Sequence, residues 1–344
     1  MFINALRTCT ALAVLATASA AYAGGPSIKT ERTGGLKGKS TVAIGAFRVI
    51  WVRQDSIGAS STNNFGGGLT GRATVEQEAF LLGLEKPQMQ KLTDQIYADF
   101  LTKLKAKGYT VIEPKDLLAK APQAASLEMT ENFETGRWGT YVVPSGQSSI
   151  QLAADESKAV GRGSKGGVFS GFKQQGQKTK KGEADKVLPE ASKAIGDTPV
   201  IGVTIVASFA QFKGSGYSHW GQSAKTKIMT GATINGAQEK QDAMVTGIQV
   251  WDAHMYDNCK IACPLSTLAL VGDIHDEHSV GEMVKYDAKT HGERITNAFS
   301  DFTGDAAKHK GYIVNLDPAA YDQNMPVVAA QANDLLVASL AKER

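Results

Sequence analysis

Five side chains that can bind a transition metal lie within one short segment of this sequence. They are His254, Cys259, Cys263, His275 and His278. Imidazole nitrogen and thiolate sulfur are ligands that zinc and copper prefer, and the C-x3-C and H-x2-H spacings suit a tetrahedral site. One prediction is therefore a metal- or small-ligand-binding protein with zinc or copper as its cofactor.

A disulfide between Cys259 and Cys263 is the competing and favoured prediction for this segment. The third cysteine, Cys9, lies in an N-terminal segment that we expect to be removed. In an oxidising compartment neighbouring thiols pair readily, and three intervening residues let a turn bring the two sulfurs together. The favoured expectation is a small disulfide-closed loop and no cofactor.

The catalytic motifs of this sequence fail on spacing or on context. His275 and His278 are three residues apart, whereas zinc proteases place their two histidines four apart on a helix. Residues 161–166 fit G-x-G-x-x-G, but no apolar strand precedes them and no periodic helix follows. Ser218 and His219 are adjacent, so on a strand they would point to opposite faces. We therefore predict no catalytic residue and favour a non-enzymatic protein, with an unrecognised hydrolase as a further alternative.

A small aromatic group stands among glycines between two expected strands. It consists of Tyr217, His219 and Trp220. The favoured interpretation is a strand-connecting hairpin with aromatic cover. Because exposed aromatic side chains are common at recognition surfaces, the alternative is a binding patch.

The N-terminus predicts export. Arg7 is followed by an apolar stretch over 11–20 and by Ala21-Tyr22-Ala23 before Gly24, which are the parts of a cleavable signal peptide over residues 1–23. The expected location is periplasmic or secreted, without a transmembrane segment after processing. The formal net charge of +3 gives no strong preference for polyanions, so nucleic acid is not an expected partner.

The elements that would position these residues follow from the apolar patterning. Residues 41–52 and 199–209 are rich in β-branched side chains and predict buried strands, the first of them central in a sheet. Apolar residues three or four apart predict a helix from Met89 to Leu104, followed by a short strand over 109–112 and a helical turn. Further strands are expected near 226–233, 244–253 and 265–271, as an antiparallel meander, and helices over 293–308 and 327–340.

These elements predict an α/β (α+β) fold, with a mixed sheet, packed helices and one main domain. Its first part would span 41–144, and its second part would span 198–344. Three polar, glycine-rich segments are expected to lack regular structure: a flexible lead-in over 24–40, a long loop over 54–74 and a flexible Gly/Lys-rich insertion over 145–197.

Parts of the chain resemble a family of envelope proteins. The order of a strand over 42–52, an amphipathic helix and Gly108-Tyr109-Thr110-Val111-Ile112-Glu113 resembles the opening α/β unit of the curli secretion lipoprotein and of the TolB N-terminal domain. Residues 244–253 resemble the strand in that group which ends in an aspartate turn. The lipidation cysteine is missing, the insertion has no counterpart, and no clear pair of transmembrane hairpins is visible.

The resemblance implies a periplasmic accessory or assembly role, with an envelope protein or a surface-assembly component as the partner. It does not imply a pore. Assembly into a homo-oligomer is a further alternative.

Overall fold

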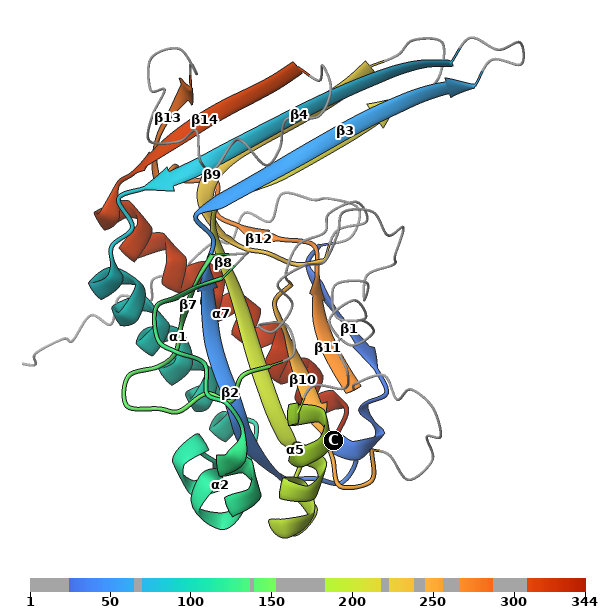
Figure 1. The fold of residues 1–344 in the computed structure, drawn as a ribbon, viewed down its shortest axis with the longest axis vertical. Coiled ribbons are helices and arrows are strands. Elements are labelled where there is room, and N and C mark those ends of the chain that lie inside the picture. Colours follow the sequence, from blue (N-terminus) through green and yellow to red (C-terminus); the bar gives the residue numbers. More distant parts are fainter. Residues whose placement is uncertain are drawn as a thin grey trace, which may run out of the picture.

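The computed structural model of this protein describes residues 25–64, 70–136, 139–152, 183–217, 223–237, 245–255, 266–286 and 308–344. It consists of a body, in which helices cover both faces of a large mixed sheet, and of a β-sheet arm that projects from one end of the body (Figure 1). The predicted α/β fold with a mixed sheet and packed helices is confirmed.

Strand β2 (Thr41–Trp51) lies in the middle of the large sheet, as its buried side chains predict. It runs parallel to β8 and β5 and antiparallel to β7. The strand order is β1-β11-β10-β8-β2-β7-β6, and β9 pairs with both β8 and β12. The remaining bounds are β1 (Ser27–Glu31), β5 (Thr110–Ile112), β6 (Glu134–Gly136), β7 (Gly139–Val142), β8 (Val200–Tyr217), β9 (Ser223–Ile234), β10 (Gly247–Trp251), β11 (Ser266–Val271) and β12 (Ile274–His275).

Alternate residues of β2 face two different groups of helices. Val42 and Ile44 belong to the main core, which the helices α1 (Lys86–Ala106) and α7 (Pro318–Lys342) complete. Ala43 belongs to a second core beneath α2 (Pro114–Lys120) and α5 (Glu183–Ala194). Because side chains of a strand alternate between its faces, one strand holds both helix layers. The helices predicted over 89–104 and 327–340 are confirmed as α1 and α7.

The arm is a second sheet of four strands in the order β13-β14-β4-β3. Its strands are β3 (Gln54–Asn64), β4 (Thr70–Leu82), β13 (Gly281–Tyr286) and β14 (Lys308–Leu316). This sheet contacts the outer parts of β8 and β9, which project from the body in the same direction (Figure 1). Ala79 and Val314 of the arm share the main core with Phe209 and Phe212 of β8, so the arm has two layers and an apolar interior.

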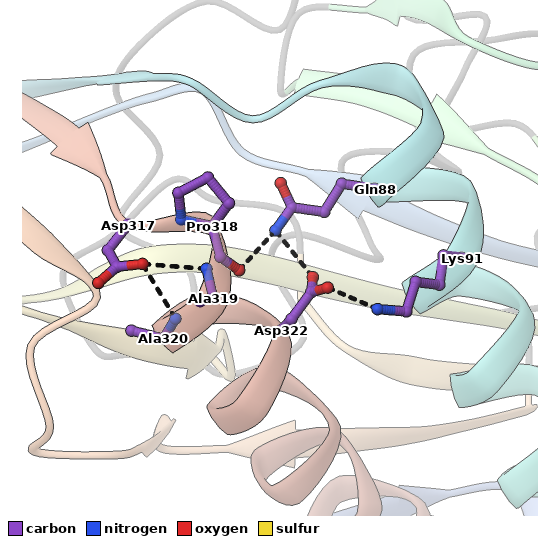
Figure 2. A network of polar contacts seen from close by, with 7 residues as sticks. All are labelled: Gln88, Lys91, Asp317, Pro318, Ala319, Ala320 and Asp322. Atoms are coloured by element: carbon purple, nitrogen blue, oxygen red, sulfur yellow. Dashed lines mark hydrogen bonds and ion pairs between the residues drawn. The ribbon is translucent and has the colours of Figure 1, made fainter.

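A polar network joins the starts of the two body helices α1 and α7, which follow the arm strands β4 and β14 (Figure 2). Asp322 of α7 accepts hydrogen bonds from Gln88 Nε2 at 2.8 Å and from Lys91 Nζ at 2.6 Å, both on α1. Asp317 caps α7 by accepting from the backbone N–H of Ala319 at 3.0 Å. The starts of the two helices are therefore joined to each other directly below the arm.

Two segments expected to lack structure form strands instead. Within 24–40, Ser27–Glu31 pairs with β11, and Thr33 and Leu36 are buried. Within 54–74, β3 pairs with β4 from Gln54↔Phe80 to Asn64↔Thr70. The prediction was wrong because it relied on side chains, which have low strand propensity in both segments. Backbone hydrogen bonds stabilise these strands, and the layer of β8 and β9 also supports β3 and β4.

The predicted insertion over 145–197 is also partly wrong. Ile150 and Leu152 are buried, and α5 packs Leu188 and Ala191 against Trp251 in the second core. Residues 153–182 lie outside the described part of the chain. The glycines and lysines of those residues dominate the composition of the whole window and hide the helical spacing of α5.

The meander and one helix also need correction. The 18-residue β8 pairs with β9 along its outer part and with β10 near its start, so β9 and β10 are not neighbours. Of the helix predicted over 293–308, residues 293–307 lie outside the described residues, and Lys308 begins strand β14.

Candidate functional site

The three predicted histidine ligands lie at two separate places. His254 follows β10 and lies near Ser266, at the start of β11, whereas His275 and His278 come after the far end of β11. Six residues of strand separate these ends by about 20 Å. Cys259 and Cys263 lie outside the described residues. Within the part of the chain that the structure describes, no three side chains of the metal-binding types His, Cys, Asp and Glu form a group.

His275 is mostly buried beside strand β9. Its Nδ1 lies 2.8 Å from Thr233 Oγ1, and its ring fills the space that a side chain at Gly231 would need. Burial, with the positive charge of Lys213, lowers the pKa of His275 to about 4. At neutral pH the imidazole is therefore uncharged and acts as a packed hydrogen-bonding group.

His278 contacts its own turn. Its Nδ1 lies 2.6 Å from Asp276 Oδ1, and the same oxygen accepts from the His278 backbone N–H at 2.9 Å. The ring is 84% exposed. This pair stabilises the turn that connects β12 to β13.

Of the predicted aromatic patch, only Tyr217 is described. It ends β8 and pairs with Ser223 of β9, which confirms the predicted hairpin strands. His219 and Trp220 lie outside the described residues.

His254 helps to line a cleft at the end of the body opposite the arm, which we call the η1 cleft. The cleft has a volume of about 350 Å3. Three segments form it: the 3-10 helix η1 (Thr33–Leu36) with its flanks, the turn before β8, and the turn after β10. Its charged lining consists of Arg32, Lys37, Lys39, Asp197, Asp252 and His254.

The segment around η1 is fixed to the body on several sides. Ser266 Oγ donates to the carbonyl oxygen of Arg32, and Thr33 Oγ1 donates to Glu343 near the end of α7. The Gly38 N–H donates to the Arg344 carbonyl at 2.8 Å, and Leu36 is 1% exposed. The cations of this segment therefore extend from a fixed backbone.

The outer strands of the arm sheet form a different kind of candidate site. Within the described residues β13 pairs with β14 alone, and β3 pairs with β4 alone. On β13, Met283 is 39% exposed and Val284 is 43% exposed. Adjacent residues of a strand face opposite sides, so β13 presents apolar side chains on both faces together with one open edge.

Sequence reasoning missed both surfaces. Arg32, Lys37 and Lys39 fell within the expected lead-in, although three cations around Gly34-Gly35 could have indicated a charged turn. Met283 and Val284 stood in a short run between polar residues, which carries no strong strand pattern. Only the pairing with β14 shows that this run is an edge.

No helix of the described residues is long and apolar enough to cross a membrane. No family model, curated protein or solved structure matches this chain.

Proposed function

We propose that this protein is a non-enzymatic protein of the periplasm or cell exterior that assembles with further copies of itself through the edges of its arm sheet. The observation that carries the proposal is the pair of outer strands of this sheet, β3 and β13, each of which pairs with a single neighbour among the described strands. The export signal and the resemblance to envelope assembly proteins support the compartment and the class.

The backbone N–H and C=O groups of one edge can form hydrogen bonds with those of the other edge on a second copy. Exposed strand edges present unpaired N–H and C=O groups, which pair readily with a strand of another chain. Since β3 and β13 belong to one sheet, β13 of one copy can extend the sheet by pairing with β3 of the next. The exposed Met283 and Val284 would then be covered in part, which adds apolar burial to the backbone hydrogen bonds.

The attachment of the arm supports an assembly role as well. A flexible strand pair would lose much conformational entropy on docking, but this arm has an apolar interior, and the helices that follow β4 and β14 are joined to each other. Its edges are therefore held in place before a partner arrives.

The test is the molar mass of the purified full-length chain, measured by light scattering over a range of concentrations. We expect an oligomer for the wild type and a shift to monomer for Met283→Lys and Val284→Lys, because a charge on an edge strand opposes pairing. Val327→Lys is the matched control, since Val327 is 51% exposed on α7, outside the arm sheet.

Two outcomes would contradict the proposal. One is a wild-type chain that stays monomeric at every concentration. The other is an oligomer that Val327→Lys weakens as much as Met283→Lys does.

A further inference from the structure

The η1 cleft carries more unpaired positive charge than its carboxylates balance. Within the described residues, the side chains of Arg32, Lys37 and Lys39 make no hydrogen bond or ion pair. All three line the same cleft and come from one eight-residue stretch. Cations that are gathered without partners raise the local concentration of anions.

The two carboxylates of the cleft lie close to other groups of its wall. Asp252 Oδ1 accepts from the His254 backbone N–H at 2.9 Å. Its carboxyl group also packs against the backbone of Gly35, where an added Cβ would lie 2.3 Å from Asp252 Oδ2. Asp197 Oδ2 lies 3.8 Å from His254 Nε2. The carboxylates therefore shape the wall and face His254, while the three cations stay available.

The backbone of the cleft has a second unusual feature. Among the described residues, three that are not glycine have a positive φ, and two of them, Arg32 at 57° and Asp197 at 57°, line this cleft. Such conformations persist where the surrounding structure enforces them, and they gather at ligand sites. Here Ser266 Oγ holds the carbonyl group of Arg32, and the next residue, Thr33, is held by Glu343.

We propose that the η1 cleft binds a small organic anion with two oxyanionic groups, phosphate or carboxylate. Its volume of about 350 Å3 suits a small molecule. The planar guanidinium of Arg32 can bind one oxyanion through two parallel hydrogen bonds, and Lys37 and Lys39 neutralise the other. This ligand site is independent of the arm, so the assembly proposed above can fail without affecting it.

Isothermal titration calorimetry on the full-length protein tests the proposal with three probes. Pyrophosphate represents phosphate ligands, citrate represents carboxylate ligands, and trehalose serves as an uncharged control. We expect one molecule of at least one anion to bind per chain, with an affinity that falls as salt is added. Trehalose should not bind. The anion that binds identifies the oxyanion chemistry of the ligand.

Charge-removing variants locate the binding. Arg32→Asn keeps a residue that tolerates positive φ, and Lys37→Gln changes an exposed side chain without a structural partner among the described residues. Each substitution should weaken the binding of the anion about tenfold or more, because a charge-assisted hydrogen bond is lost. Lys120→Gln, at the exposed end of α2, removes the same charge outside the cleft and should leave the affinity within about twofold.

Three results would overturn the proposal. The first is that neither anion binds at concentrations up to about 1 mM. The second is that Lys120→Gln weakens binding as much as Lys37→Gln does. The third is unchanged binding in both cleft variants, with their folding verified by circular dichroism.

Discussion

His275 shows how a residue that looks like a metal ligand can have a structural role. Its ring is mostly buried, contacts Thr233 and fills the space beside Gly231. The features that suggest a metal site in the sequence are the residue type and the distance along the chain to His278. The role of His275 depends on its surroundings in the fold, where burial favours the uncharged form of the ring.

This environment predicts a pH dependence of stability. The pKa of His275 is about 4 in the folded protein, whereas an exposed histidine has a pKa of 6.5. The unfolded chain therefore binds this proton more tightly than the folded protein does. The stability that neutral His275 contributes should be complete above pH 6.5 and should decrease as the pH falls toward about 4. Thermal melting of wild type and His275→Gln over this range measures the effect.

We expect a smaller decrease in melting temperature for His275→Gln than for wild type. His254→Gln is the control for the loss of an imidazole elsewhere in the protein, because that ring is 67% exposed. If the wild type and His275→Gln melt with the same pH dependence, another group is responsible.

Helix α5 has a buried polar contact with the central sheet. Asp185 Oδ1 accepts a hydrogen bond from Trp251 Nε1 at 2.8 Å, and both residues are largely buried, with exposures of 7% and 1%. This bond joins α5 to the end of β10, next to the η1 cleft. Without its acceptor, the indole N–H would stay buried and unpaired.

Asp185→Ala should therefore lower the free energy of unfolding by about 1–3 kcal/mol. The urea midpoint of Asp185→Ala compared with that of wild type measures this cost. In the background of Trp251→Phe, which lacks the N–H, the same substitution should cost less. Equal costs in both backgrounds would show that the bond does not hold α5.

Elements with apolar spacing could be predicted from the sequence, and elements stabilised by pairing could not. Phe100 and Leu336 lie on apolar stripes, so α1 and α7 were predictable. Strand β3 reads Ser, Gly, Ala and Asn along most of its length and forms through backbone bonds to β4. The η1 cleft was hidden for a related reason, since it combines turns that lie far apart in the sequence.

On the scale of the whole molecule, two neighbouring strands of the arm continue into two neighbouring helices of the body. Strands β4 and β14 are parallel partners, and the network around Asp322 links the helices α1 and α7 that follow them. The arm and the body thus share one continuous set of elements. Because both helices complete the main core, the arm cannot be treated as an appendage.

The pairing of β4 with β14 also constrains the time at which the native structure can form. β4 belongs to the first third of the chain and β14 begins at residue 308, so a chain that emerges N-terminus first exposes the β4 edge that β14 covers until synthesis is almost complete. Contacts so distant in sequence form slowly, and until they form the open strand edge favours aggregation.

We therefore expect that a chain ending at residue 307 accumulates as insoluble material while the complete chain stays soluble, as fractionation after expression would show. A soluble truncated chain with native-like circular dichroism would contradict this. If the expectation holds, newly made chains depend on a chaperone that shields the β4 edge until the C-terminal residues arrive.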